Sequence, residues 1–469
     1  MTPLLPSLSP RVQRRVHAWL CLAVASLVGA GLFAGLVAMA RTPWVQELLP
    51  GGEYLHGALV AHVVLSVVVW FLAFQGSLWA LAEGGQRAHG ISGRLAWAGF
   101  WAAVLGTAVL MIPAFLGWGH PVLANYVPVL THPAFLAGLF LFGTGMGLAA
   151  FHALRVHLRA PRPLSFWSSG AAVSAGLVLV ALVCFGLAAL RVPPGTPSWM
   201  AAEHLAWGGG HVLQFASTAA MAWVWLILAR WTLDEPVLRD PWAKAVLAFY
   251  LVFALPAPLL YLGDASTARE GFTLLMAMGL GPGTGILALA VILALHRRWR
   301  SPEGLPWGDP GFAGLVLSLA VFGLGGILAL GIRGSNVVVP AHYHGVIGGV
   351  TLAFMGLSYH LLPRLGRNVW RQGLARVQPY LYGSGQALFV LGLFWAGLHG
   401  VPRKTFGAAQ GLHQADQVVG MVLMGLGGLV AILGGIAFIL NLVPSLLRRA
   451  ASEPALAPAW WRRAEEGEA

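Results

Sequence analysis

The sequence predicts an all-α integral membrane protein that crosses the bilayer twelve times. Of its 469 residues, 58% are hydrophobic and only 9% are charged, whereas a soluble domain has about 25% charged residues. Apolar stretches of about 20 residues, the length that a bilayer core requires, recur along the whole chain. The connections between them are short, which predicts one membrane domain over residues 1–449 and a polar cytoplasmic tail over residues 450–469.

Each of the twelve apolar segments is long enough to span a bilayer core. In chain order, their predicted limits are 17–40, 56–82, 93–116, 132–154, 168–190, 202–230, 243–263, 270–296, 311–332, 338–363, 379–400 and 414–446. The first segment is too long for a cleavable signal peptide, so we expect it to remain as a helix. Glycine runs in the tenth and twelfth segments, 345-GVIGG-349 and 420-GMVLMGLGG-428, favour close helix packing.

The distribution of positive charge supports this number of spans. If both termini are cytoplasmic, the cytoplasmic side holds 22 of the 28 Lys and Arg residues. The outer loops hold the other six, which are Arg41, Arg191, Arg269, Arg333, Arg403 and Lys404. This asymmetry follows the positive-inside rule, and adding or removing one segment would disrupt it. Topology therefore explains the net charge of +12, and no nucleic-acid partner is needed.

Four histidines in three of these segments are candidate ligands. His342 and His344, in 341-AHYHG-345, are two positions apart, so a helix directs them about 200° apart. They cannot share a metal ion, but they can bind one group on each side of the helix. The pair lies about 6–9 Å from the outer end of its segment, His62 about 9–10 Å and His211 about 13 Å. This common depth is not expected of unrelated buried histidines, and neutral imidazole is a good axial ligand for heme iron.

The tenth segment resembles that of heme–copper oxidase subunit I, in which a His-aromatic-His motif ligates two hemes from one helix. Its continuation, 355-MGLSYHLLPRLG-366, is similar to the B-type branch of that family. Two further stretches resemble the region after the family's eleventh helix and its second helix, namely 395-WAGLHGVPRK-404 and 62-HVVLSVVVWFLAF-74. The resemblance covers nearly the whole chain. It implies the twelve-helix arrangement of that subunit, in a prokaryotic-type cytoplasmic (inner) membrane.

The resemblance also implies a role for each matching residue. His62 and His344 would be the two axial ligands of a low-spin heme. His342 would be the proximal ligand of a high-spin heme with an open distal face. Arg403 and Lys404 would pair with the heme propionates, which gives a reason for two positive charges in one outer loop.

The low-spin ligand has an alternative in His56. This residue stands in 55-LHGAL-59, which also looks like a second-helix motif of the B-type branch. We favour His62 because it lies deeper, at the level of His344.

The copper site of the family is only partly matched. His211 matches the ligand of the sixth helix, but the seventh segment has Leu, Leu and Tyr at 259–261, where the family has a histidine pair. Phe215 also stands where the family has a tyrosine that is crosslinked to a histidine. One imidazole does not make a copper site, so we predict that copper is absent. A non-heme metal bound by His211, Tyr261 and Asp264 is an alternative.

Together these features predict a membrane diheme respiratory oxidoreductase. Electrons would enter from a cytochrome c or cupredoxin-like donor at the outer face and pass from the low-spin to the high-spin heme. His342, His211, Gln214 and Tyr261 would form the reactive site for O2, NO or another nitrogen or sulfur oxide. Intramembrane acids are scarce, so we expect no efficient proton pumping. The alternatives are a non-catalytic heme protein for electron transfer or gas sensing, and a cofactor-free transporter, which would need polar groups at the midplane.

Overall fold

The computed structural model describes residues 8–49, 53–84, 91–160, 164–234 and 236–448. Most of them are helical, as expected of a chain that must satisfy its backbone hydrogen bonds internally inside a membrane. Twelve helices of the described residues are long and apolar enough to cross a bilayer. The predicted all-α membrane class and number of spans are thereby confirmed. The sidedness of the termini stays a prediction, and the predicted tail over 450–469 lies outside the described residues.

In chain order the elements are α1 (Pro10–Met39), η1 (Val45–Leu48), α2 (Glu53–Val63), η2 (Val64–Val69), α3 (Trp70–Ala82), α4 (Ile91–Leu116), β1 (Pro121–Val122), β2 (Val129–Leu130), α5 (Pro133–Leu158), α6 (Phe166–Arg191), α7 (Ser198–Leu233), α8 (Asp240–Ala254), η3 (Ala257–Leu262), α9 (Ala265–Trp299), α10 (Pro310–Leu328), η4 (Ala329–Gly331), α11 (Val338–Arg364), α12 (Gln372–Leu398), η5 (Gly407–Gln410) and α13 (Ala415–Leu447). The short β1 and β2 pair antiparallel, with Pro121 opposite Leu130. The η2 segment is π-helical, and the other η elements are 3-10 helices.

The observed helices differ from the predicted segments mainly at their ends. Helix α12 begins at Gln372, before the predicted start at 379, because its first turns are polar but still helical. The seventh predicted segment is divided, since α8 ends at Ala254 and the 3-10 helix η3 follows. Pro256 and Pro258 stand at this break, and proline cannot donate the backbone hydrogen bond that a continuous α-helix requires.

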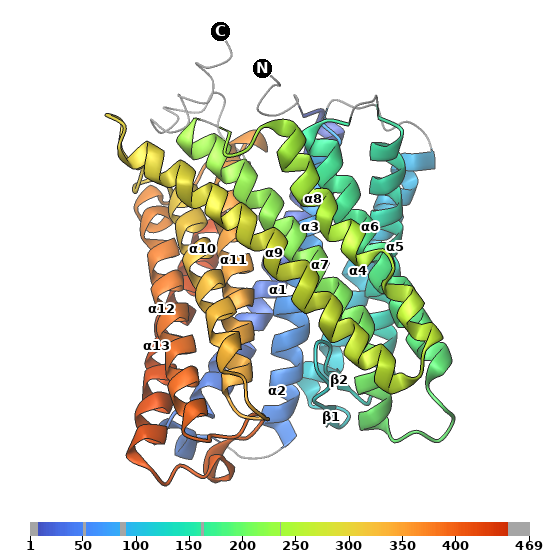
Figure 1. The fold of residues 1–469 in the computed structure, drawn as a ribbon, viewed down its shortest axis with the longest axis vertical. Coiled ribbons are helices and arrows are strands. Elements are labelled where there is room, and N and C mark those ends of the chain that lie inside the picture. Colours follow the sequence, from blue (N-terminus) through green and yellow to red (C-terminus); the bar gives the residue numbers. More distant parts are fainter. Residues whose placement is uncertain (1–7, 50–52, 85–90, 161–163, 235, 449–469) are drawn as a thin grey trace. The chain divides into compact units, whose positions relative to one another are not determined.

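The chain divides into two compact units, which comprise Met1–Ala23 with Ser66–Leu305 and Val24–Leu65 with Pro306–Ala469. In the first unit α4 packs along α5, and α7 packs against α6, α8 and α9. In the second unit α12 packs along α13, and α10 packs along α11 (Figure 1). Helices α7 and α11 are the most deeply buried spans, and they carry three of the four candidate histidines. A single membrane domain over 1–449 stays a prediction.

Glycine permits the closest helix pairs within each unit. A Cβ atom on an interface glycine of α4–α5 or α12–α13 would collide with the backbone of the facing helix. These glycines are Gly99, Gly106, Gly138, Gly145, Gly385, Gly392, Gly420, Gly427 and Gly434. Helices inside a bilayer attract one another largely through such close contacts. The runs at 345–349 and 420–428 include glycines of this kind, which confirms their predicted role in packing.

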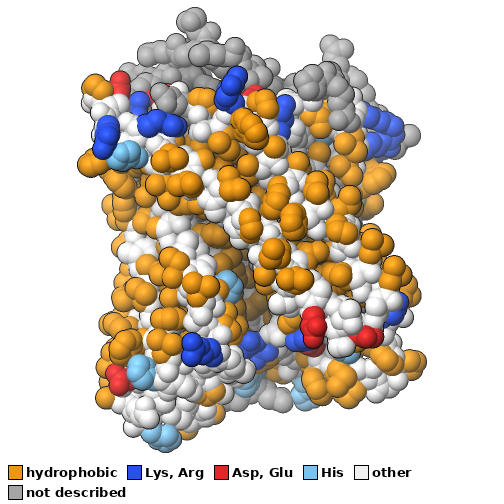
Figure 2. Space-filling model, in the orientation of Figure 1, with side chains coloured by type: hydrophobic (Ala, Val, Ile, Leu, Met, Phe, Trp, Pro, Cys, Tyr) orange, Lys and Arg blue, Asp and Glu red, His pale blue; other side chains and the backbone are white. Residues whose placement is uncertain are grey.

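Hydrophobic side chains cover most of the face shown in Figure 2, and Lys and Arg gather toward the helix ends. Two buried acids of the described residues lie just outside the spans. Glu83 pairs with Arg15, and the His152 ring lies 3.1 Å from Glu83. Burial alone would raise the pKa of Glu83, but the hydrogen bond with His152 and the charge of Arg15 lower it below its usual value. Asp309 caps α10 and lies 2.9 Å from the His360 ring.

Candidate functional site

His342 lies where α10 and α11 approach most closely. A Cβ atom on Gly325 of α10 would lie only 2.6 Å from the backbone nitrogen of Val346. This close approach brings the Gly325 carbonyl to 2.9 Å from Nδ1 of His342. A carbonyl can only accept a hydrogen bond, so Nδ1 carries the proton and Nε2 carries the lone pair. The ring is therefore held in the tautomer that ligates a metal through Nε2.

His344 is oriented by its own helix. Its Nδ1–H donates to the carbonyl of Pro340, one turn earlier, at 2.8 Å. Its ring lies 4.9 Å from the ring of Tyr343 and 5.0 Å from the ring of Phe389 on α12. His342 thus bonds to α10, whereas His344 faces α12. The predicted divergence of the two rings is confirmed, and Nε2 of His344 also carries the lone pair.

His62 lies at the end of α2, directly before the π-helical segment η2. Its Nδ1–H donates to the carbonyl of Ala30 on α1 at 3.1 Å. The lone pair again resides on Nε2. His62 and His344 also lie close enough for an electrostatic interaction between their side chains. Residues separated widely in the sequence are thus brought to one region of the second unit.

The predicted basic pair lies in the loop between α12 and α13. This loop is joined to the start of α11 by a hydrogen bond of 3.0 Å from the Val337 N–H to the Val401 carbonyl. Lys404 has a positive φ of 61°, and the charge of Arg403 acts on Tyr343 of α11. The loop therefore holds the basic pair beside the outer turns of the helix that carries both candidate heme ligands.

Arg41 is a third cation of this region, and the sequence reasoning missed it as a site residue. It donates from Nη2 to the Pro402 carbonyl at 3.3 Å, and its charge also acts on Tyr343. Burial lowers the pKa of Arg41 to about 10. Its Nε is buried without a hydrogen-bond partner among the described residues. The only sequence signal was its position in an otherwise charge-poor outer loop.

His56, the alternative low-spin ligand, also lies near this loop. Its Nε2 is 3.4 Å from the Lys404 carbonyl, and its ring lies 4.9 Å from the ring of Phe406. These contacts support the preference for His62, because they direct the His56 ring toward the loop. The choice between the two stays a prediction.

His211 of α7 has a hydrogen-bond partner at each of its two ring nitrogens. Its Nδ1–H donates to the Trp207 carbonyl at 2.7 Å. Its Nε2 must then accept, and the hydroxyl of Tyr126 lies 2.9 Å away as the donor. The ring is almost fully buried, at 1% exposure, and lies 4.5 Å from the ring of Tyr126. Tyr126 is thus a site residue that the sequence reasoning did not identify.

The loop before α5 is built to hold Tyr126 in this place. Its φ of 67° is unusual for a tyrosine. The preceding residue, Asn125, is fixed to Glu203 of α7 by two hydrogen bonds, 2.8 Å from the backbone and 2.6 Å from the side chain. Gly210 leaves the space that the Tyr126 ring fills, since a Cβ atom there would collide with it. A signal was present in the run 207-WGGGH-211, because consecutive glycines beside a histidine indicate rings packed against the helix.

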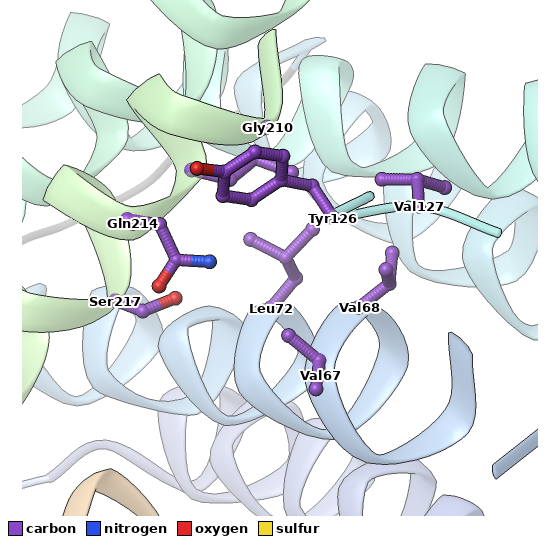
Figure 3. Close-up of a pocket in the computed structure, with 9 residues that line it drawn as sticks. Val67, Val68, Leu72, Tyr126, Val127, Gly210, Gln214 and Ser217 are labelled. Atoms are coloured by element: carbon purple, nitrogen blue, oxygen red, sulfur yellow. The ribbon is translucent and has the colours of Figure 1, made fainter. Parts of the chain in front are cut away.

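Gln214 lines a small cavity beneath Tyr126 (Figure 3). The cavity of about 10 Å³ is also lined by Ser217 of α7 and Leu72 of α3, and it has room for roughly one water molecule. Figure 3 shows the Gln214 amide, the Ser217 hydroxyl and the Tyr126 ring around this space. The predicted reactive-site residue Gln214 is therefore close to Tyr126.

Tyr261 and Asp264 lie in a different environment. The Tyr261 hydroxyl rests against Gly208, and its ring lies 5.3 Å from the ring of Phe272. Asp264 caps α9 by accepting from the Thr267 N–H at 2.8 Å. In the described part of the chain no three His, Cys, Asp or Glu side chains are placed to hold a metal ion. Tyrosine side chains and pairs of ligands are outside this set, so a metal bound by His211, Tyr261 and Asp264 stays a prediction.

Comparison with known proteins decides the family. The family described as Cytochrome C and Quinol oxidase polypeptide I matches residues 14–430. The chain belongs to this family. It is 27% identical over 473 residues to cytochrome c oxidase subunit 1 of Thermus thermophilus, which covers 92% of the chain and 84% of that relative. It is also 26% identical over 490 residues to an uncharacterized protein of Rickettsia prowazekii, covering 90% of the chain and 94% of that protein.

The fold agrees with this assignment. A solved heme-copper terminal oxidase dimer matches the structure with a TM-score of 0.73 at 20% identity, covering 95% of the chain and 86% of that structure's chain. The predicted recognition of a cytochrome oxidase subunit I-like protein, with its twelve-helix arrangement, is confirmed. The family is one of membrane oxidoreductases that bind heme.

The residues present fit the heme of the family. His62, His342 and His344 each use Nδ1–H on a backbone carbonyl and so present Nε2, as axial ligands do. The unpartnered Nε of Arg41 suits an anionic group such as a propionate.

The residues do not fit the copper of the family. Copper needs several nitrogen ligands with available lone pairs. The lone pair of His211 faces the hydroxyl of Tyr126 instead. The position of the histidine pair is held by Leu259 and Leu260, of which Leu259 is largely exposed. The absence of copper stays a prediction, with which the contact between Tyr126 and His211 agrees.

Proposed function

We propose that this cytochrome oxidase subunit I-like chain is a membrane oxidoreductase that works with two hemes and without a copper centre. The observation that carries the proposal is the shared hydrogen bonding of three imidazoles, each of which gives its Nδ1–H to a backbone carbonyl and keeps its Nε2 lone pair. His62 and His344 would hold a low-spin heme, and His342 would hold a high-spin heme.

Bound hemes of these two kinds supply one-electron transfer and an open iron position for a small molecule such as O2 or NO. The chain's own residues hold and orient them. Arg41, Arg403 and Lys404 stabilise carboxylates at one end of α11, and the Gly325 carbonyl fixes the plane of the His342 ring. Electrons would come from a cytochrome c or cupredoxin-like donor at the outer face of a prokaryotic-type cytoplasmic membrane.

The pocket of His211 would serve the small ligand in place of a second metal. His211, Gln214 and Tyr126 supply hydrogen-bonding groups around a space of about one water. Tyr261, which we expected to take part, lines another cavity, so Tyr126 is the better candidate for the hydroxyl of this pocket. The two buried acids described above, Glu83 and Asp309, are each paired at a helix end. This scarcity supports the absence of efficient proton pumping.

The test is an optical and metal analysis of the purified protein and four variants. We expect two hemes per chain, one of which reacts with CO, and much less than one copper. His342→Ala should remove the CO-reactive heme, and His62→Ala or His344→Ala should remove the low-spin heme. His56→Ala is the matched control and should keep both. A colourless wild-type protein, or loss of the low-spin heme in His56→Ala instead of His62→Ala, would refute this assignment.

A second candidate is a non-catalytic heme protein for electron transfer or gas sensing. One observation favours it, namely that the Tyr126 hydroxyl occupies the lone pair of His211. His211 would then not bind the second metal that faces the high-spin iron in the family. Turnover of O2 and NO by the reduced protein distinguishes the two candidates. Measurable turnover supports the oxidoreductase, whereas intact diheme spectra without turnover support the sensor or carrier.

A further inference from the structure

A cavity of about 220 Å³ lies in the first unit, where the ends of α6, α7, η3 and α9 meet. We expect this end to face outward, from the charge distribution. This volume is about 22 times that of the small cavity beneath Tyr126, which suits a polar head group better than a single ion. Its lining includes two aromatic residues, Trp207 and Phe272, and the small residue Gly208. Neither the proposed hemes nor the His342 site uses this cavity.

Two guanidinium groups line the cavity, and both keep donors available. Arg269 lies 3.5 Å above the ring of Trp207 and 3.4 Å from Glu203. Arg191 donates from Nη1 to the Gly263 carbonyl at 3.4 Å. Each guanidinium has five N–H donors, so these contacts leave most of them for an anion. Paired arginines are well suited to phosphate because they bind two oxygens at once.

The Tyr261 hydroxyl is a third group that requires a partner. It is buried against Gly208 and has no hydrogen-bond partner among the described residues. A buried hydroxyl without a partner destabilises a protein. An oxygen of a ligand in the cavity would satisfy it, and His204 lines the same space.

Two acidic residues near the cavity, Glu203 and Asp264, bear on which kind of charged ligand fits it. Glu203 is already bonded to Asn125 through both of its oxygens. Asp264 lines the cavity and is exposed, and the hydrogen bonds from the Thr267 N–H and the Ser266 hydroxyl lower the pKa of Asp264 to about 2. A fixed negative charge therefore faces the same cavity as two arginines. This arrangement complements a zwitterion better than a simple anion.

Apolar surface adjoins the cavity directly. Leu262 precedes the lining residue Gly263 and is 78% exposed, and Leu190 precedes Arg191 and is 83% exposed. Leu259, one turn earlier in η3, is 64% exposed. On a membrane-spanning chain such residues meet acyl chains. A ligand with both a charged head and an apolar tail fits this site better than a free ion.

We propose that this cavity binds an amine-bearing phospholipid, with its phosphate on Arg191, Arg269 and the Tyr261 hydroxyl and its ammonium group beside Asp264. The acyl chains lie on the exposed leucines of α6 and η3. The site orders one lipid at the outer end of α7, next to the segment that carries His211.

The experiment is a titration of the delipidated full chain, followed by native mass spectrometry. The probes are dihexanoyl phosphatidylethanolamine, dihexanoyl phosphatidylglycerol and inorganic phosphate. The variants are Arg191→Gln/Arg269→Gln, Tyr261→Phe and Asp264→Asn, and Asn is a good helix cap that keeps α9 intact. Arg333→Gln is the matched control, because Arg333 is an exposed arginine of the other unit. Melting curves check that each variant is folded.

We expect the wild type to bind the ethanolamine lipid about three- to fivefold more tightly than the glycerol lipid, since Asp264 is exposed. The double arginine variant should bind both lipids at least about tenfold more weakly, Tyr261→Phe should weaken both by a smaller factor, and Arg333→Gln should change nothing. Asp264→Asn should abolish only the preference between the lipids. Unchanged binding by the folded double variant, equal binding of both lipids by the wild type, or binding of inorganic phosphate as tight as that of lipid would overturn the proposal.

Discussion

Replacing Gly325 by alanine tests whether the close contact of α10 and α11 positions His342, the proposed ligand of the high-spin heme. The Cβ atom of Gly325→Ala would lie 2.6 Å from the Val346 nitrogen and 2.8 Å from the His342 carbonyl. Both are backbone atoms, so no side-chain rotation relieves the collision. Gly326→Ala is the matched control, because a Cβ atom at Gly326 has nothing within 4 Å. The two variants add the same methyl group to adjacent positions of one helix.

The structure gives the size of the effect. Ordinary Cβ contacts begin at 3.4 Å, so the two helices must separate by about 0.8 Å at this level. The Nδ1–carbonyl distance of His342 would then rise from 2.9 Å to about 3.5 Å or more, where little hydrogen bonding remains. Overpacking costs about 1–3 kcal/mol, and the lost hydrogen bond adds about 1 kcal/mol. His344 bonds to its own helix and should keep its orientation.

The assay is the CO difference spectrum of the reduced protein, together with its total heme content. We expect Gly325→Ala to lose most of its CO-reactive heme and to keep its low-spin heme, whereas Gly326→Ala should resemble the wild type. If Gly325→Ala binds CO as the wild type does, the close contact does not position His342. If both variants lose CO binding equally, the effect belongs to α10 in general and the reasoning from the Gly325 carbonyl is wrong.

Three further predictions concern other parts of the chain. Tyr126→Phe leaves the buried Nε2 of His211 without a donor, so it should lower the stability by about 1–3 kcal/mol, and a thermal melting curve that does not change would contradict the contact. Arg41→Gln should release heme more readily during detergent washing than Arg333→Gln does, because its unpaired Nε is buried. At pH values above its usual pKa of 4.5, the ionised Glu83 side chain stabilises the fold. This contribution is lost as the pH falls through the lower pKa that Glu83 has in the folded protein. Melting temperatures below pH 4.5 should therefore fall more steeply in the wild type than in Glu83→Gln.

The number of helices and the directions of the two α11 histidines could be predicted from the sequence, since both follow from local geometry. A bilayer core of fixed thickness sets the helix length, and a fixed turn of about 100° per residue separates His342 from His344. The contacts of His342 with α10 and of His344 with α12 agree with this. Helix ends were less predictable, because the polar start of α12 carries no hydropathy signal.

The groups that orient the histidines could not be predicted. His62 bonds to a carbonyl 32 residues away, and His342 bonds to one 17 residues away. Backbone carbonyls are present at every residue, so nothing in the composition marks these two. Arg41 was visible only as a loop charge, because its proximity to Tyr343 depends on how α1 and the loop after α12 pack together.

Tyr126 bears on both departures from the family pattern at the copper site. These are the absent histidine pair at 259–260 and Phe215 in place of a tyrosine. If copper is absent, as we predict, His211 has no metal to bind, and a buried imidazole nitrogen without any partner is destabilising by about 1–3 kcal/mol. A phenol from the loop before α5 supplies that partner, although it lies 85 residues away in the chain. The tyrosine replaced by Phe215 in the sixth-helix motif is therefore not needed for hydrogen bonding at this point. It follows that the substitutions Leu259→His and Leu260→His would not by themselves recreate a copper site, because Tyr126 would still hold the lone pair of His211. Only their combination with Tyr126→Phe should raise the bound copper measured by metal analysis.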